Sequence, residues 1–310
     1  MSSILVKRIR LRLRPLDMET GRHIVVLHER DSQQLGHMPG SRIRIGANGR
    51  EYVMIANVSG RLVEPGELGT FIEATEILGL KQGAEVEVSL APQPASISAI
   101  KKKLRGESLS AEEIGTIVRD IVSNNLTTTE LTAFIVAQYT RGMSMEEIVA
   151  LTRHMVETGE KLEFDTKPIL DVHSIGGVPG NKYALLTVPI VSAAGLKVPK
   201  TSSRAITSAA GTADVMEVLA PVDLSLEEIK RIVNRVGAVL AWGGAVRLAP
   251  ADDIIIQVER HLGIDPRCQL LASVMSKKLA VGADRVVIDI PTGLGAKVCT
   301  REEARELAHD

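Results

Sequence analysis

The chain has 310 residues, in which 37 Lys and Arg nearly balance 38 Asp and Glu, so the net charge is −1. This balance argues against a protein dedicated to nucleic-acid polymers, which would need a basic surface. Apolar residues make up 45% of the chain but aromatic ones only 2%, so we expect an aliphatic core and little stacking of bases between rings. The two cysteines, Cys268 and Cys299, are too few for a disulfide framework, which indicates a reducing cytoplasm.

No stretch is typical of a signal peptide or a membrane span. The apolar start Met1–Val6 is too short for a signal peptide. The longest apolar run, Ala184–Leu196, contains Pro189 and Gly195 and is shorter than a bilayer requires. We therefore expect a cytoplasmic protein without a membrane partner.

Alternating polar and apolar residues predict β-strands near the N-terminus. Residues 8–14, 42–45 and 84–88 alternate with period two, and Pro-Gly and Asn-Gly turns separate them. We expect a small β-barrel-like domain over residues 1–92. The arginines on one face of the first strand could meet an anion, but a solvated or intersubunit face explains them more simply; they are Arg8, Arg10, Arg12 and Arg14.

After a Pro-containing linker at 91–95, the hydrophobic period changes to that of helices. Capping boxes begin at Ser110 and Ser144, and apolar residues follow each at helical spacing. A further helix is expected around Leu131–Ile135. These features predict a small helical domain over residues 93–166, which we expect about 250–282 to join.

From residue 167 onward, apolar strands alternate with helices, which is typical of an α/β domain. The strands are expected at 168–172, 196–200, 238–241 and 286–290, and a capped helix at Ser225. The last residues, 301–308, begin an amphipathic helix with nothing to pack beneath it, so we expect a shortened chain whose α/β domain, 167–310, is incomplete. The fold class is therefore multidomain, combining α+β with α/β architecture.

A glycine-rich loop, Asp171–Lys182, joins the first of these strands to a helix. Its glycines let backbone N–H groups approach an anion, and the helix dipole adds to their effect. It is not a nucleotide-triphosphate P-loop, because no Gly-Lys-Ser/Thr stands at the required spacing. The candidate anion ligands are Ser174, Gly176, Gly177 and Lys182.

A second strand-to-helix loop, Lys200–Thr212, is rich in hydroxyl groups. Both loops should face the carboxyl edge of the sheet, where ligands bind in α/β folds. Together they suggest one ligand with a phosphate at one end and a sugar beside it. The candidate ligands are Ser202, Ser203, Arg204, Ala205, Ile206, Thr207, Ser208 and Thr212.

These two loops and a third motif, Ala272–Lys278, resemble the thymidine/pyrimidine-nucleoside phosphorylase family. The N-terminal β-domain and the residues Ser202–Thr212 most resemble the family branch that acts on nucleoside 5′-monophosphates, the AMP phosphorylases. The resemblance covers essentially the whole chain. Family chains are longer, which agrees with the expectation of a shortened chain.

The resemblance implies a reversible phosphorolysis, in which inorganic phosphate cleaves an N-glycosidic bond. With AMP the products are adenine and ribose 1,5-bisphosphate. The chemistry needs no metal, and the sequence offers no His-Glu-x-x-His pattern, so we expect no cofactor. The expected partners are AMP or another nucleoside monophosphate and inorganic phosphate, with the chain forming a homodimer or higher homo-oligomer.

Two departures from the pyrimidine branch favour a nucleotide substrate. That branch has a phosphate-binding Lys where this chain has Val172, and a His where it has Ser208. The positive charge for phosphate must then come from Lys182, Lys200 or Arg204, and the sequence leaves these open. A substrate with its own 5′-phosphate would need a set of anion-binding residues different from that of the pyrimidine branch.

The resemblance also assigns roles near the base. Ser273 and Lys277 stand at i, i+4 on one helix face and would contact the base. The alternative is that Lys277 and Lys278 are both exposed to solvent. Apolar neighbours in the sequence argue against a helix that is exposed on all sides. Lys297, after a third glycine turn, would reach the phosphate end of the ligand, unless it is an ordinary surface lysine.

Asp265 precedes Pro266, which would suit a helix N-cap. The resemblance instead implies that Asp265 donates the proton to the departing base. His173 is the rival acid, because histidine titrates in the right range. Hinge or interdomain contacts are expected of Arg247, Asp252 and Asp253.

Three alternatives remain open from the sequence. One is a pyrimidine-nucleoside (thymidine) phosphorylase. Another is a catalytically incomplete nucleotide-binding or assembly fragment. A phosphoribosyltransferase is less favoured, because that reaction needs Mg²⁺ and no clear acidic ligand pair occurs.

Overall fold

The computed structural model describes residues 7–176, 178, 182–204 and 210–310. The chain forms two compact units, one of Met1–Ser98 with Ser123–Leu131 and the other of Ala99–Val122 with Thr132–Asp310. The domain boundaries expected from the sequence remain predictions. In the described ranges no helix is both long and apolar enough to cross a bilayer.

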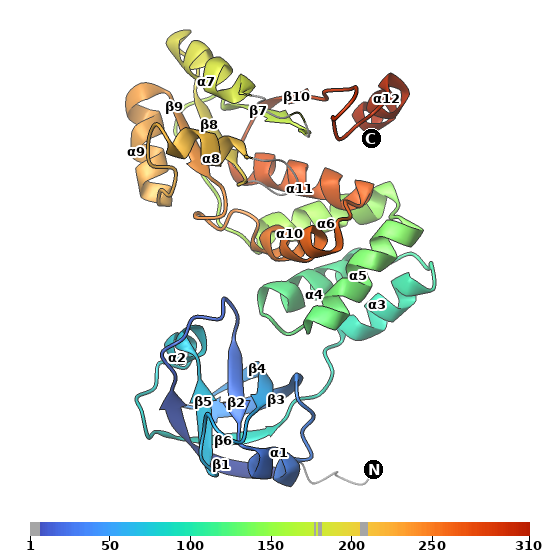
Figure 1. The fold of residues 1–310 in the computed structure, drawn as a ribbon. Coiled ribbons are helices and arrows are strands. Elements are labelled where there is room, and N and C mark those ends of the chain that lie inside the picture. Colours follow the sequence, from blue (N-terminus) through green and yellow to red (C-terminus); the bar gives the residue numbers. More distant parts are fainter. Residues whose placement is uncertain (1–6, 177, 179–181, 205–209) are drawn as a thin grey trace. The chain divides into compact units, whose positions relative to one another are not determined.

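The first unit contains a closed barrel of six strands in the order β1-β5-β2-β4-β3-β6 (Figure 1). The alternation in β1 puts Ile9, Leu11 and Leu13 into the core. Its arginines lie outside, where Arg8 and Arg14 pair with glutamates of neighbouring strands at 2.8 and 3.0 Å. The strands are β1 (Arg8–Pro15), β2 (Ile24–Leu27), β3 (Ser41–Ala47), β4 (Arg50–Val58), β5 (Glu67–Thr70) and β6 (Glu85–Leu90).

The segment expected to be entirely β also contains two short helices, α1 (Glu29–Leu35) and α2 (Ile72–Leu78). Each ends at a glycine with positive φ, Gly36 and Gly79. The sequence expectation was wrong here because seven residues are too few to establish a helical period. A glycine at this position is a helix stop signal, and it can be recognised in the sequence.

Four helices follow: α3 (Ser96–Leu104), α4 (Ala111–Val122), α5 (Thr128–Arg141) and α6 (Met145–Glu157). The capping boxes expected at Ser110 and Ser144 are both formed, with Glu113 and Glu147 as their reciprocal partners. α3 was not expected from the sequence. Its polar face, with three consecutive lysines, hid the apolar stripe.

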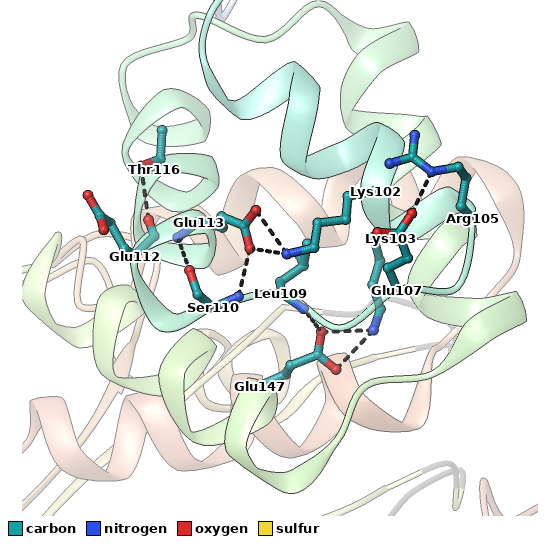
Figure 2. A network of polar contacts seen from close by, with 10 residues as sticks. All are labelled: Lys102, Lys103, Arg105, Glu107, Leu109, Ser110, Glu112, Glu113, Thr116 and Glu147. Carbon is teal, nitrogen blue, oxygen red and sulfur yellow. Dashed lines mark hydrogen bonds and ion pairs between the residues drawn. The ribbon is translucent and has the colours of Figure 1, made fainter.

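Two of those lysines form ion pairs between α3 and the N-termini of α4 and α6 (Figure 2). Lys103 contacts both carboxylate oxygens of Glu147 at 2.8 and 2.9 Å, and both side chains are buried. The same carboxylate accepts the backbone N–H groups of Leu109 and Ser144. Glu147 is thus both a helix cap and the counter-ion of a buried lysine. Lys102 makes a more exposed equivalent with Glu113 at 2.8 Å.

The α/β part contains two parallel strand pairs, β10–β7 and β8–β9, connected by a parallel bridge between Ile169 and Lys197. This arrangement brings the carboxyl ends of β7 and β8 to the same edge, as the sequence predicted. The elements are β7 (Leu170–Ser174), α7 (Tyr183–Ala193), β8 (Val198–Ser202), α8 (Thr212–Glu217), α9 (Leu226–Val236), β9 (Ala238–Trp242) and β10 (Arg285–Asp289).

Two further helices, α10 (Pro250–Leu262) and α11 (Arg267–Ala280), pack against α4 and α6 (Figure 1). These two helices supply one wall of the candidate site at the strand ends. The capping box at Ser225, which opens α9, is also confirmed.

The final helix, α12 (Arg301–His309), does have a core beneath it, contrary to the sequence expectation. Leu307 is buried, and Ala304 packs against the same apolar cluster, which contains Ile175, Val274 and Val298. Arg267 adds an ion pair to Glu306 at 3.3 Å. The expectation failed because these contacts come from segments distant in the sequence.

Candidate active site

A cavity of about 180 Å³ lies at the carboxyl ends of β7 and β8 and is closed on another side by α11. Most residues that the sequence singled out line it, although their roles remain predictions. Those residues are His173, Ser174, Gly176, Ser202, Ser203, Arg204, Thr212, Ser273, Lys277 and Lys297. Gly177, Ala205, Ile206, Thr207 and Ser208 lie outside the described residues.

Two of the proposed phosphate cations are poorly placed. Lys182 precedes α7 and is exposed, and it does not line the cavity. Arg204 lines the cavity, but its guanidinium pairs with Glu217 at 2.6 Å and Asp214 at 3.2 Å and lies over Trp242. The hydrogen bond with Glu217 raises the pKa of Arg204. Its charge is therefore shared with two carboxylates of the protein.

Three lysines of the cavity each have a carboxylate partner. Lys277 pairs with Asp252 at 2.5 Å, and Lys297 pairs with Asp265. Lys278 pairs with Asp171 at 2.5 Å and is only 2% exposed. The alternative of a solvated Lys277 and Lys278 pair is therefore wrong: Lys278 is buried, Lys277 is partly buried, and both ammonium groups form ion pairs.

Lys200 is the exception among these lysines. Its Nζ donates to the Thr201 carbonyl at 2.5 Å, and no carboxylate within the described part of the chain pairs with it. Burial lowers the pKa of Lys200 to about 7, and the nearby charge of Lys278 acts in the same direction. The adjacent Thr201 Oγ1 is buried and also lacks a partner among those residues. The cavity is therefore lined by one lysine, Lys200, that has no carboxylate partner in the described part of the chain.

His173 stands among these lysines at the end of β7. Burial lowers the pKa of His173 well below its ordinary value, and Lys278 and Lys200 add electrostatic repulsion. The imidazole is consequently neutral at physiological pH. This weighs against His173 as the group that donates a proton to a departing base.

The third glycine turn does approach the first one. Ser174 at the end of β7 donates to Asp289 of β10 at 2.8 Å. The backbone N–H of Lys297 donates to the Gly176 carbonyl at 3.4 Å. Lys297 is thereby held at the rim of the cavity rather than free on the surface.

A second cavity, of about 50 Å³, adjoins the first and contains Asp265. The two share Ile256, Leu270, Ser273 and Lys297 among their lining residues. α11 begins at Arg267 with Pro266 as its N-cap residue, so the interpretation of Asp265 as that N-cap is wrong.

Asp252, expected as a hinge contact, organises this wall of the site. It is fully buried and accepts hydrogen bonds from Ser273 at 2.8 Å and Gln269 at 3.0 Å besides pairing with Lys277. Ser273 and Lys277 do share one helix face, as the i, i+4 spacing predicted. Their common partner could not be predicted from the helix pattern, because it lies 21 and 25 residues earlier in the chain.

Among the described residues, no group of three or more His, Cys, Asp or Glu side chains could hold a metal ion.

Two family models match the chain. Residues 97–159 match the helical bundle domain of a glycosyl transferase family, and residues 166–310 match the α/β domain of that family. The chain belongs to this glycosyl transferase family.

Its relatives include several AMP phosphorylases. The chain is 55% identical to AMP phosphorylase 1 of Archaeoglobus fulgidus over 94% of its own length and 58% of the relative. It is 53% identical to the AMP phosphorylase of Pyrococcus furiosus over 97% of its length, and 52% identical to that of Methanothrix thermoacetophila over 96%. The chain thus spans 57–60% of the length of these curated relatives.

A solved structure also resembles it. Anthranilate phosphoribosyltransferase from Thermus thermophilus matches with a TM-score of 0.54 and 25% sequence identity, over 68% of this chain and 62% of that one. The likeness supports a phosphoribosyltransferase-like arrangement of the helical and α/β parts.

Proposed function

We propose that the protein catalyses the reversible phosphorolysis of nucleoside 5′-monophosphates, with AMP and phosphate giving adenine and ribose 1,5-bisphosphate. The observation that carries the proposal is the cavity at the strand ends, which four lysines line. Three of them pair with aspartates that are not part of its lining, and Lys200 has no carboxylate partner among the described residues. A bound phosphate would supply the counter-ion of Lys200. The identity of 50% or more to AMP phosphorylases supports the choice of reaction.

In the proposed reaction, a phosphate oxygen bonds to C1′ of the ribose as the C1′–N bond breaks. The electron pair of that bond moves to the base, which then takes up a proton on a ring nitrogen. The protein has to hold the phosphate close to C1′ and stabilise the negative charge that develops on the base. Neither task requires a covalent intermediate with the protein.

Lys200 is our choice for the cation that binds phosphate. The parallel bridge of Ile169 and Lys197 places Val172 level with Lys200 on the neighbouring strand. The charge that the pyrimidine branch carries on the first strand would therefore be supplied from β8. Unlike Arg204, Lys200 has no carboxylate partner among the described residues to give up when phosphate binds.

Asp265 is the proposed proton donor. It lines the smaller cavity beside the first one and pairs with Lys297, which lines both. A 5′-phosphate that binds Lys297 would compete with the Asp265 carboxyl group for this cation. Asp265 would then be released from the ion pair and could approach the departing base.

Phosphate-dependent release of the base, measured with AMP, CMP, UMP and thymidine, tests the proposal. We expect turnover with AMP and none with thymidine. Turnover confined to thymidine would instead establish the pyrimidine-nucleoside phosphorylase alternative. AMP binding without any base release would indicate a nucleotide-binding role. A homo-oligomer is also proposed, and light scattering of the same sample tests it.

A further inference from the structure

One ion pair of the site joins a lysine of the cavity lining to a carboxylate behind that lining. Lys278 on α11 is 2% exposed and lines the larger cavity. Its Nζ lies 2.5 Å from Oδ2 of Asp171 on β7, whose side chain is fully buried and is not part of the lining. The other oxygen of this carboxylate accepts the backbone N–H of Val172 at 2.7 Å. Lys278 therefore lines the cavity while its counter-ion lies behind the cavity wall.

The neighbouring strand carries the lysine that we propose for phosphate binding. Lys200 on β8 is 3% exposed, lines the same cavity and has no carboxylate partner among the described residues. A parallel bridge between Ile169 and Lys197 joins β7 to β8, so Asp171 and Lys200 lie on adjacent strands. Burial lowers the pKa of Lys200, the charge of Lys278 lowers it further, and Asp171 acts in the opposite direction. The two charges of the ion pair thus act on Lys200 with opposite signs.

The availability of Lys200 depends on this pairing. A buried carboxylate without a counter-ion is unfavourable, and it attracts any cation that can approach it. The other two lysines of the lining are held by aspartates of their own. Lys200, which lacks a carboxylate in the described part of the chain, is therefore the lining lysine that an unpaired Asp171 would compete for.

We propose that Lys278 is a positioning residue of the anion site, which neutralises Asp171 and thereby keeps Lys200 available to inorganic phosphate. The inference rests on the proposed function and deepens it, because it gives a role to a buried pair that the proposed reaction does not use. Lys278 acts through Asp171 and does not have to touch the anion. Its effect is electrostatic, so it requires the charge of the side chain and not only its hydrogen bond.

Sulfate binding, measured by titration calorimetry at pH 6, tests the proposal. Sulfate has the shape and the double charge of the phosphate dianion, and Lys200 is mostly protonated at this pH. Lys278→Gln keeps a hydrogen bond to Asp171 but removes the charge, so sulfate should bind about 10-fold more weakly or worse. The double variant Asp171→Asn/Lys278→Gln removes both charges and should recover the affinity to within about 3-fold of wild type.

Asp171→Asn alone should have the opposite effect. The amide keeps an oxygen for the Val172 N–H but presents its NH₂ group to Lys278, so two donors would face each other. The ammonium group of Lys278 then loses its partner and adds its charge to the cavity. We expect sulfate to bind about 3-fold more tightly or better. If Lys278→Gln does not fold, this variant provides the decision, and an unchanged or weaker affinity in it would overturn the inference.

A second lysine–aspartate pair provides the control. Lys167 and Asp284 lie 2.9 Å apart, are more exposed and do not line the cavity. The variants Lys167→Gln, Asp284→Asn and their combination should bind sulfate as wild type does. A change in these variants equal to that in the Lys278 pair would show a general charge effect and would overturn the inference.

Three further results would overturn it. Equal sulfate affinity in wild type, Lys278→Gln and Asp171→Asn would mean that the pair only holds α11 against β7. An affinity that stays low in the double variant would make Lys278 a direct ligand of the anion. Absence of sulfate binding by the wild type would show that the neutralised pair does not leave a receptive site.

The same samples distinguish this inference from the proposed function. Sulfate affinities in the expected order, in a chain that releases no base from AMP, would support the inference and contradict the proposed function. Phosphate-dependent release of adenine by a chain whose variants all bind sulfate equally would support the function and contradict the inference.

Discussion

Lys200 shows how a single residue can make a cavity receptive to anions. Burial of an ammonium group without a counter-ion costs free energy, and this cost lowers the pKa of the group. The pKa of about 7 means that Lys200 is only half charged near neutrality. An anion that binds beside it would restore the charge, and the proton uptake would appear as a pH dependence of affinity.

Sulfate is a suitable probe because it stays doubly charged over the whole range. We expect its affinity for the wild type to fall above pH 7, by up to about 10-fold per pH unit, because Lys200 must then bind a proton. Lys200→Met should bind sulfate weakly and with a flatter pH profile. Calorimetric titrations at pH 6 and pH 9 measure this.

Lys197→Met, at the amino end of the same strand, is the control and should keep the wild-type profile. If Lys200→Met retained both the wild-type affinity and its pH dependence, another group would be responsible.

Asp265→Asn tests the proposed proton donor. An amide keeps the size of the side chain but cannot protonate the base, so turnover of AMP should fall by about 10²-fold or more while AMP affinity changes much less. Steady-state assays combined with calorimetric binding separate the two quantities. Unchanged turnover would exclude Asp265 as the acid.

Glu259, which is buried on α10, should affect stability. Its pKa is about 8 in the folded chain, against an ordinary value of 4.5 in the unfolded chain. Between these values the folded state binds more protons, so the free energy of unfolding falls as pH rises from about 4.5 to 8. Glu259→Gln removes this titration and should gain stability relative to wild type, on the order of 4 kcal/mol, between pH 5 and pH 9.

Urea unfolding at the two pH values measures the difference. The groups that share the surroundings of Glu259, and whose titration has to be considered, are Asp252, Asp265, Cys268, Lys277, Lys297 and Arg260. A stability difference that does not depend on pH would contradict the assignment.

At the scale of elements, α3 provides a comparison between a buried and an exposed ion pair. Lys103→Met would leave Glu147 buried without its cation, which should lower the free energy of unfolding by about 3 kcal/mol. Lys102→Met on the same helix breaks only the exposed pair with Glu113 and should cost about 1 kcal/mol or less. Urea unfolding checks both, and equal losses would contradict this account of the network.

The elements also show what could be predicted from the sequence. The capping boxes at Ser110, Ser144 and Ser225 were predictable because each is completed within four residues. The alternation in β1 was equally local. The short helices α1 and α2 were not predicted because seven residues are too few to establish a helical period.

For the site, the two strand-end loops were predictable because parallel strands must present their carboxyl ends at one edge. The charge pairing was not. Lys278 and Asp171 are separated by 107 residues and meet only when α11 packs across the strands.

At the scale of the whole molecule, a net charge of −1 conceals a local excess of positive charge. Arg8 and Arg14 of β1 pair with glutamates of neighbouring strands, whereas Lys200, which has no carboxylate partner among the described residues, lines an open cavity. Attraction of an anionic substrate to the protein should therefore come from the cavity and not from the overall charge. Raising the salt concentration should slow association only moderately, since the Debye length is already about 8 Å at physiological ionic strength.

The pairing of three lysines with three aspartates has a thermodynamic consequence. Two anions that enter this cavity together bring more negative charge than one unpaired lysine can offset. The site should respond by taking protons from the solvent. The heat of binding would then vary with the ionisation enthalpy of the buffer, so titrations in phosphate-free Tris and in cacodylate should give different apparent enthalpies for the same affinity.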